Sequence, residues 1–388
     1  MKRGLTGKYE ISTIGGESVQ AFVPFDLPPV PKLRDSGARR KLLERATIAL
    51  GGLDSIVVLL PDPNLFLYSY VRREAVLSSQ IEGTQSSFSD LLLFELKEAP
   101  GVPLDDVVEV SNYVAALEHG IQRLKEGFPL CNRLIREVHG KLLPSGRGSQ
   151  RAPGEFRRSQ NWIGGTRPGN AHFVPAPPEQ LEACMTGLER FFHDESAPYP
   201  VLLKAAFSHV QFETIHPFLD GNGRVGRLLI ALLLHEAGIL SQPLLYLSLY
   251  FKQYREAYYH LLDAVRTEGD WEAWVDFFLE GVEQTAGGAV KTAKRLVALF
   301  NDDTSRTQRY GRNSSTTLRV FNVLCKRPLL TINEAKRLTE LSFPAVNKAM
   351  EALVTIGIVR ELTGGRRNRV FAYQQYLTTL LEGTEAFQ

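Results

Sequence analysis

The chain has 388 residues, of which 44% are hydrophobic and 23% are charged, and its formal net charge at pH 7 is +2. This length allows two or three domains with their own cores, and the composition is that of an ordinary globular protein. The nearly neutral charge excludes a general electrostatic attraction to nucleic acid or membranes. The longest apolar runs, such as Leu228 to Leu234, are far shorter than the roughly 18 residues that a membrane-spanning helix needs.

The cysteines and the first residues indicate where the protein resides. Cys131, Cys184 and Cys325 are odd in number and widely spaced, which predicts reduced thiols and neither disulfides nor a zinc site. The stretch MKRGLTGKYEIS has no apolar core after its charged residues, so no secretory signal is expected. These features together predict a cytoplasmic protein.

The first third of the chain is predicted to be helical after an irregular start. Residues 1 to about 35 are turn-rich and end in FVPFDLPPVPKL, whose prolines favour extended chain laid over a surface. A helical pattern follows from Arg39 to about Leu96, with breaks expected at Gly51-Gly52 and at Pro61-Asp62-Pro63. Further helices are predicted over Val107 to Lys125 and Asn132 to Leu143.

A region rich in Gly and Pro interrupts the helices at about 144–178. Within it, NWIGG and AHFVP are joined by TRPGN, which predicts a short β-hairpin. Helical periodicity returns at Glu179 and continues to about Phe300. The next stretch, NDDTSRTQRYGRNSS, is polar and aperiodic, so a linker is predicted before a smaller domain at about 314–388.

The segment HPFLDGNGRVGR, residues 216–227, concentrates residue types that suit phosphate chemistry. Backbone N–H groups of a glycine-rich turn before a helix converge on an anion, and Arg224 and Arg227 lie on one helix face where they can neutralise a polyphosphate. Asp220 is suited to hold Mg²⁺, and His216 is suited to accept a proton at neutral pH. Each residue alone has an ordinary explanation, such as a structural histidine or an N-cap aspartate. The density of the pattern favours a site.

This segment resembles the signature of the Fic family, H-x-F-x-(D/E)-G-N-G-R-x-x-R, and matches it at every specified position. The resemblance implies transfer of AMP from ATP to a hydroxyl of a target protein or of the chain itself. It further implies that His216 deprotonates the hydroxyl, Asp220 binds Mg²⁺ and Phe218 anchors the loop in the core. The implied phosphate ligands are Gly221, Asn222, Gly223 and Arg224, with Arg227 at the γ-phosphate.

Two flanking segments extend the resemblance over roughly residues 60 to 285. PGEFRRSQNWIGGT, residues 153–166, resembles the family's flap. The resemblance implies that a target segment is aligned by strand addition along residues 159–175. The flap residues Ile163, Gly164, Gly165 and Thr166 are expected beside the bound ATP. Downstream, Tyr258 and Tyr259 are candidates for an adenine pocket, although aromatic residues at helical spacing more often belong to a core.

The stretch SSQIEG, residues 78–83, matches the family's inhibitory motif (S/T)-x-x-x-E-(G/N) through Ser78, Glu82 and Gly83. The match implies that Glu82 pairs with Arg227 and removes it from the γ-phosphate. Gly83 also suits a helix C-cap, which would leave Glu82 an ordinary polar residue at a helix end.

The C-terminal segments read as three helices followed by GGRRNRVFAY, a hairpin with its turn at Gly364-Gly365, and they resemble a winged helix-turn-helix. Residues 314–388 carry ten Lys or Arg and six Asp or Glu, for a net charge of +4. Arg366, Arg367 and Arg369 on the expected wing suit contact with DNA phosphates. A protein-docking or dimerisation role is the alternative.

The sequence therefore predicts a mainly α protein with a Fic helical-bundle core, a small β-hairpin flap and a C-terminal winged helix. The predicted function is a protein adenylyltransferase that uses Mg-ATP and is inhibited by Glu82. Two alternatives stay open: removal of AMP, with Glu82 orienting water, and a nucleotide-sensing DNA-binding regulator. The target protein and the formation of a homodimer also stay open. The predicted regions are 1–105 with the inhibitory helix, 106–300 as catalytic core, 301–313 as linker and 314–388 as winged helix.

Overall fold

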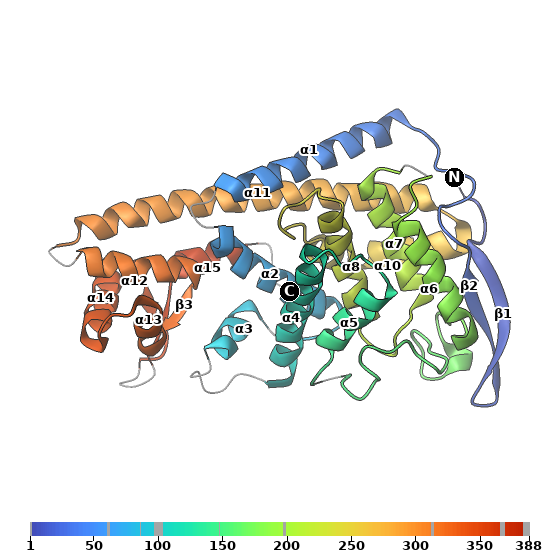
Figure 1. Cartoon of the computed structure of the whole chain (residues 1–388), viewed down its shortest axis with the longest axis horizontal. Coiled ribbons are helices and arrows are strands. Elements are labelled where there is room, and N and C mark those ends of the chain that lie inside the picture. The colour runs from blue at the N-terminus through green and yellow to red at the C-terminus, as the bar shows by residue number, and fades with distance from the viewer. Residues whose placement is uncertain are drawn as a thin grey trace. The chain divides into compact units, whose positions relative to one another are not determined.

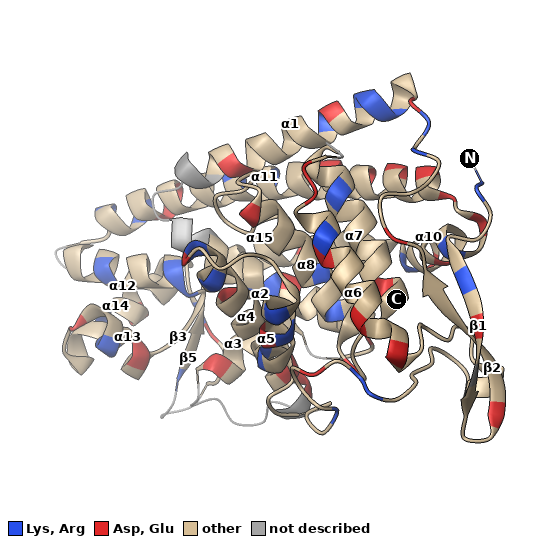
Figure 2. Cartoon of the chain, turned by 45° about the vertical axis from the view of Figure 1, so that its right-hand side comes forward, with Lys and Arg blue, Asp and Glu red and all other residues tan. Residues whose placement is uncertain are grey.

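The computed structural model is mainly helical, with two small antiparallel sheets among the residues that it describes, which confirms the predicted α fold (Figure 1). Within these residues, every helix is too short or too polar to cross a membrane. Basic and acidic residues are interspersed along helices such as α1 (Gly37–Leu59), in line with the nearly neutral net charge (Figure 2). The structure describes residues 2–59, 63–85, 87–96, 104–146, 148–196, 199–311, 314–364 and 369–382.

The chain divides into two compact units. Unit 1 consists of Met1–Gly51 and Asn112–Ala286, and unit 2 consists of Gly52–Ser111 and Gly287–Gln388. This grouping differs from the predicted boundaries near residues 105, 300 and 313, because three continuous helices run from one unit into the other. These helices are α1, α4 (Leu104–Lys125) and α11 (Trp271–Arg309).

Unit 1 begins with a β-hairpin, where the sequence predicts only irregular chain. Strands β1 (Gly7–Ile14) and β2 (Glu17–Pro24) pair antiparallel and are joined by Gly15 and Gly16, whose φ angles are 57° and 85°. Two residues with positive φ form the turn that best matches the twist of a two-stranded hairpin. The expectation of irregular extended chain over residues 1–35 is therefore wrong for β1 and β2.

Helices α7 (Val201–Ile215) and α8 (Asn222–Glu236) form the centre of unit 1 and pack against each other. Both are buried on nearly all sides, as expected for helices that are apolar all round. Helix α6 (Pro178–Phe192) packs beside α7 (Figure 1). The remaining elements of unit 1 are α5 (Asn132–Leu142), the short 3₁₀ helix η1 (Pro168–Asn170), α9 (Ser248–Gln253) and α10 (Arg255–Glu268).

Helix α11 continues to Arg309, through most of the predicted linker at 301–313. Asp303 and Thr307 are only 1% and 0% exposed, and the Tyr373 hydroxyl donates to Asp303 Oδ2 at 2.6 Å. Polar residues that find partners within a folded unit can be buried, and a hydrophobic periodicity in the sequence does not reveal them. The linker prediction is therefore wrong for residues 301–309.

The C-terminal part of unit 2 combines three helices with a three-stranded antiparallel sheet. The strand order is β3-β5-β4, and α14 packs against both α12 and α13. Three helices lie where the sequence predicts them, while the name winged helix-turn-helix stays a prediction. The elements are α12 (Ser314–Lys326), β3 (Leu329–Thr331), α13 (Ile332–Thr339), α14 (Phe343–Thr355), β4 (Arg360–Glu361), β5 (Val370–Ala372) and α15 (Gln374–Leu381), and unit 2 also contains α2 (Pro63–Ile81) and α3 (Phe88–Glu95).

Candidate active site

The chain reverses direction at His216, directly after helix α7. The His216 N–H donates to the Phe212 carbonyl at 2.9 Å, but the His216 backbone is left-handed, with φ 52° and ψ 59°. A left-handed backbone is strained for a residue other than glycine and persists where the surrounding structure enforces it. The side chain is half-buried, with Nδ1 3.4 Å from the Glu213 carbonyl oxygen. The fold thus fixes the imidazole where the loop to α8 begins.

Asn222 closes this loop. The Phe218 N–H donates to Asn222 Oδ1, and Asn222 Nδ2 donates to the Phe218 carbonyl, both at 2.8 Å. The Asn222 side chain, only 2% exposed, is therefore engaged with the loop's own backbone, and any contact with phosphate falls to its N–H. The first hydrogen bond of α8 runs from the Val225 N–H to the Gly221 carbonyl, so the N–H groups of 222–224 lie at the positive end of the helix dipole.

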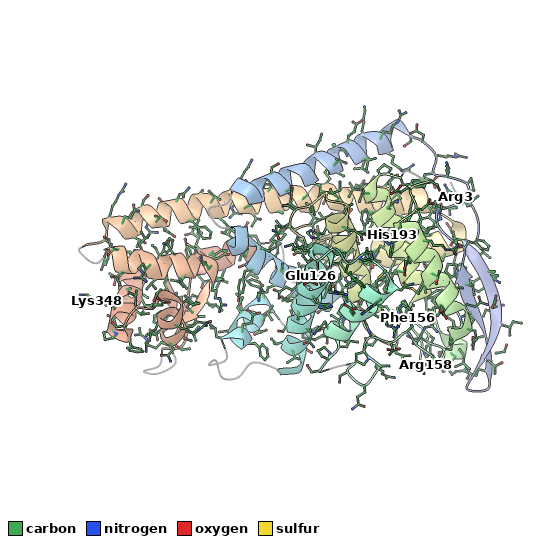
Figure 3. The ribbon with its side chains drawn as sticks, in the orientation of Figure 1. Arg3, Glu126, Phe156, Arg158, His193 and Lys348 are labelled. Carbon is green, nitrogen blue, oxygen red and sulfur yellow. The ribbon has the colours of Figure 1, made fainter. Side chains whose placement is uncertain are left out.

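Phe218 lies in the core, as the resemblance implies. Its side chain is fully buried and stacks on the His139 ring, with 3.7 Å between ring centroids and 7° between planes. Phe156, labelled in Figure 3, approaches Phe218 from the segment after α5 at 5.3 Å between centroids. The loop is thus attached to the core midway between His216 and the start of α8.

His139 contacts this loop directly, although no motif in the sequence points to it. His139 Nε2 lies 3.0 Å from the Asp220 carbonyl oxygen, and the Gly154 N–H donates to His139 Nδ1 at 2.8 Å. Burial lowers the pKa of His139 to about 4, against the opposing effect of the Asp220 carbonyl. The ring is therefore neutral at pH 7. The sequence signal was an apolar helix face that carries one histidine, which is more often a core residue than a functional one.

Arg157 is a second residue that sequence reasoning missed. Its N–H donates to the Pro217 carbonyl at 2.9 Å, and its Nε donates to the His216 carbonyl at 3.0 Å. The guanidinium also donates to the carbonyl groups of Ala176 and Ser159. Burial lowers the pKa of Arg157 to about 10, which leaves it charged at pH 7. Arg157 therefore holds the segment PGEFRRS against the α7–α8 loop, because its buried guanidinium binds carbonyl groups of both.

Arg224 and Arg227 lie one turn apart near the start of α8, as predicted. Arg227 is 5% exposed, and the Arg224 side chain is 2% exposed with Nη2 3.5 Å from Asp220 Oδ1. Two guanidiniums at a helix N-terminus suit the binding of a polyanion.

Asp220 is the acidic residue of the loop and the candidate Mg²⁺ ligand. Its side chain is 33% exposed, and Oδ1 accepts the Gly221 N–H at 2.6 Å. The described residues contain no group of three or more side chains that suit a metal ion. Mg²⁺ commonly takes one or two carboxylates, several waters and oxygen atoms of a substrate phosphate. One partly exposed carboxylate therefore fits a Mg²⁺ that arrives with a nucleotide.

The flap forms a smaller hairpin than predicted. Ile163 and Phe173 form a single antiparallel bridge, with N–H to carbonyl distances of 2.8 Å and 3.1 Å. Gly164 and Gly165 both have a φ of 70°, so NWIGG leaves the extended conformation there, while the Thr166 N–H donates to Asn170 Oδ1 at 3.0 Å. The NWIGG–AHFVP strand pairing is therefore wrong beyond this bridge. Nδ2 of Asn161 lies 3.4 Å from the Phe218 carbonyl, which brings the flap base to the loop.

Tyr258 and Tyr259 differ in their surroundings. Tyr258 is 1% exposed, its hydroxyl lies 2.9 Å from His209 Nε2, and its ring stacks on Phe251 at 4.6 Å. Tyr258 is thus a core residue, which argues against a role in an adenine pocket. Tyr259 is 43% exposed on α10, beside Arg255, and its predicted contact with adenine stays a prediction.

The inhibitory motif lies in unit 2, at the end of α2. Ser78 is fully buried, whereas Glu82 follows the last helical residue and is exposed. Gly83 has a φ of 96°, and its N–H donates to the Gln80 carbonyl at 3.1 Å, as in a helix C-cap. Gly83 therefore acts as a C-cap of α2, and the inhibitory role of Glu82 stays a prediction.

On the expected wing, Arg366 and Arg367 lie outside the described residues. Arg369 donates to Glu361 at 2.7 Å and to Asn347 at 3.1 Å. Glu361 raises the pKa of Arg369, chiefly through this hydrogen bond. The charge of Arg369 is thus paired within unit 2, which weakens its expected role at DNA.

Comparison with known proteins agrees with this geometry. Residues 40–122 match the region described as Fic/DOC family N-terminal, and residues 129–234 match the Fic/DOC family itself. Curated relatives named Protein adenylyltransferase Fic, from Drosophila persimilis and Drosophila melanogaster, are 34% and 33% identical over 187 residues. The alignment covers 48% of this chain and 34% and 35% of those relatives, so the chain spans about a third of their length.

Two solved structures share the fold. A Fic family protein from Desulfovibrio desulfuricans G20 superposes with a TM-score of 0.57 at 18% identity, over 88% of this chain and 98% of that chain. A Fic domain containing signaling protein from Bacteroides thetaiotaomicron VPI-5482 gives a TM-score of 0.50 at 22% identity, over 66% of this chain and 96% of that chain. The chain is therefore similar to the Fic/DOC family over two regions, with the family's N-terminal region matched at residues 40–122 and its Fic domain matched at residues 129–234.

Proposed function

We propose that this chain transfers AMP from ATP to a Ser, Thr or Tyr hydroxyl of a protein. The acceptors can include the chain itself. The observation that carries the proposal is the loop between α7 and α8, which holds a half-buried histidine at one end and two buried arginines at a helix N-terminus at the other. The name of the aligned relatives, protein adenylyltransferase, supports the same reaction.

The phosphates of ATP would bind at the start of α8. The N–H groups of residues 222–224 and the helix dipole favour negative charge there, and Arg224 and Arg227 add two cations. Gly221 and Gly223 carry no side chains that would keep phosphate oxygen atoms from the backbone. Asp220 would hold Mg²⁺, which on binding stabilises the charge of the phosphates.

In the proposed reaction His216 is the general base. The target hydroxyl oxygen forms a bond to the α-phosphorus, the bond from that phosphorus to the pyrophosphate leaving group breaks, and His216 accepts the hydroxyl proton. The hydrogen bond from Arg157 to the His216 carbonyl and the bond from the His216 N–H to Phe212 fix the backbone that carries the imidazole. Such orientation is worth a large part of a transfer reaction's barrier.

The target segment would add at the outer edge of residues 161–165. The other part of the flap, residues 173–175, faces Ile163 on one edge, and on its other edge β2 bonds to it through the Phe22 N–H and the Val174 carbonyl at 2.9 Å. Because residues 173–175 are bordered on both edges, a target strand would add to the flap on the side of Trp162, a residue that is 36% exposed.

Replacement of the base tests the proposal. In His216→Ala, labelling from radioactive ATP should fall at least about 100-fold, because loss of a general base costs roughly 10²–10⁴ in rate. The Kd for Mg-ATP should change little, since the start of α8 is intact. His119→Ala is the matched control, because His119 lies on α4, contacts Glu137 and should leave labelling unchanged. Labelling by His216→Ala at the wild-type rate would exclude the assignment.

Four properties stay predictions: inhibition by Glu82, removal of AMP, a cytoplasmic location and a homodimer. For residues 314–388, docking to DNA or to another protein rests on the resemblance to a winged helix and on the net charge of +4.

A further inference from the structure

His139 is a buried histidine whose ring connects two segments of the Fic domain. The Gly154 N–H donates to Nδ1 at 2.8 Å, so Nδ1 must be the acceptor nitrogen. The proton of the neutral ring is then on Nε2, which donates to the Asp220 carbonyl at 3.0 Å. Both ring nitrogens are thus engaged, and the backbone bond at Nδ1 selects the tautomer.

The His139 ring is also held by packing. It lies flat on Phe218, with centroids 3.7 Å apart and planes inclined by 7°, and both side chains are 0% exposed. Helix α5, which carries His139, packs against α8. The donor at Nε2 therefore has a fixed direction and is aimed at one carbonyl of the loop.

That carbonyl belongs to the peptide that leads into α8. The peptide joins Asp220 to Gly221, whose N–H donates to Asp220 Oδ1 at 2.6 Å. Gly221 has a φ of 77° and is the N-cap of α8. A rotation of this peptide would redirect both the Asp220 carboxylate and the first N–H groups of α8.

We propose that His139 is a positioning residue that fixes the Asp220–Gly221 peptide and thereby sets the geometry of the phosphate-binding start of α8. This inference rests on the proposed function, since the geometry matters for reaction only if nucleotide phosphates bind there. His139 itself is fully buried and would act on the site only through this peptide.

Two substitutions separate the hydrogen bonds of His139 from its packing. His139→Phe keeps an aromatic ring on Phe218 and loses both hydrogen bonds. His139→Gln loses the stacking but offers an N–H donor at nearly the position of Nε2. His119→Phe is the matched control, because His119 lies on neighbouring α4, is 26% exposed and contacts Glu137 rather than the loop.

The rate of AMP transfer and the Kd for Mg-ATP are measured for all four proteins, with the unfolding midpoint as a check on folding. We expect His139→Phe to lower kcat about 10- to 100-fold, in the range of small misplacements of reacting groups. His139→Gln should recover part of that loss, and His119→Phe should match the wild type. Wild-type kcat and Kd in a folded His139→Phe would overturn the proposal, as would a His139→Gln no better than His139→Phe.

A measurement without nucleotide distinguishes failure of this inference from failure of the proposed function. In amide spectra of the free protein, His139→Phe should shift the Gly221 N–H resonance, and His139→Gln should move it back toward the wild-type position. If the wild type transfers no AMP, the proposed function fails, but the Gly221 resonance still decides whether His139 sets this peptide. An unshifted Gly221 resonance in His139→Phe would refute the inference even in an active enzyme.

Discussion

At the scale of single residues, two buried arginines of unit 1 have different kinds of partner. Arg157 is surrounded by backbone carbonyls, whereas Arg3, labelled in Figure 3, meets a carboxylate. Arg3 Nη1 and Nη2 donate to the two oxygens of Glu272 at 2.6 Å and 2.7 Å, and Nη1 also donates to the Gly269 carbonyl at 3.0 Å. The two side chains are 2% and 10% exposed, so water screens this pair little.

Glu272 should make the stability of unit 1 sensitive to acid. Burial alone would raise the pKa of Glu272, but hydrogen bonds from Arg3 and the Arg34 N–H outweigh it and lower the pKa to about 2. A lowered carboxyl pKa stabilises the fold above the unfolded value of 4.5, and this contribution disappears as the pH falls from 4.5 toward 2. The pKa difference corresponds to about 3 kcal/mol in the free energy of unfolding.

Urea unfolding of wild type and Glu272→Gln at several pH values checks this prediction. The variant should be less stable by about 2–3 kcal/mol near pH 6, and the difference should shrink toward pH 2.5. Glu283→Gln is the control, because the Arg45–Glu283 pair is 55% and 33% exposed and such surface pairs contribute little. A pH-independent difference for Glu272→Gln would contradict the ionic origin of the effect.

At the scale of elements, the segment between α5 and α6 is the support on which the α7–α8 loop rests. It supplies Gly154 to His139, Arg157 to the His216 carbonyl and Phe156 to Phe218. Gly148 in the same segment has a φ of 85°, and a Cβ atom at this position would lie 2.7 Å from Asp220 Oδ2. The segment thus approaches Asp220 so closely that a Cβ atom at residue 148 would displace the Asp220 carboxylate.

Gly148→Ala should therefore disturb Asp220 as well as the backbone. The left-handed φ alone costs about 1–2 kcal/mol of stability for a residue with Cβ. The added methyl must in addition displace the Asp220 carboxylate, so we expect weaker Mg-ATP binding and AMP transfer lowered about 10- to 100-fold, in the range of small misplacements. Gly127→Ala separates the two effects, because Gly127 has a φ of 82° with nothing within 4 Å of the added Cβ. Equal transfer rates in the two variants would contradict the contact with Asp220.

The sequence predicts those features that depend on neighbouring residues along the chain. It does not predict features that depend on contacts between distant segments. Helices such as α5 and α6 follow from apolar periodicity, and the loop residues follow from the dense 216–227 pattern. The break expected at Gly51-Gly52 is absent because α1 continues through it, and glycine in a helix costs only about 1 kcal/mol. The roles of His139 and Arg157 depend on carbonyls 59 to 81 residues away along the chain, which no local pattern contains.

At the scale of the whole molecule, the two motifs that the resemblance connects belong to different compact units. Glu82 follows α2 in unit 2, and Arg227 lies on α8 in unit 1. Helices α1, α4 and α11 each run from one unit into the other. Inhibition by Glu82 therefore requires that a residue of unit 2 act on a residue of unit 1, which makes it a property of the entire chain.

Glu82→Gly should raise AMP transfer if Glu82 competes with the γ-phosphate for Arg227. With a carboxylate at Arg227, ATP would bind with its α-phosphate displaced, and small displacements cost about 100-fold in rate. We therefore expect Glu82→Gly to increase labelling from radioactive ATP by about 10- to 100-fold. The gain should vanish in Glu82→Gly with Arg227→Ala, because the γ-phosphate then lacks its cation in either case. Glu382→Gly is the control in unit 2, since Glu382 pairs with Arg295 far from the motif in sequence. Slower labelling by Glu82→Gly would instead favour a positive role for Glu82, such as orienting water for AMP removal.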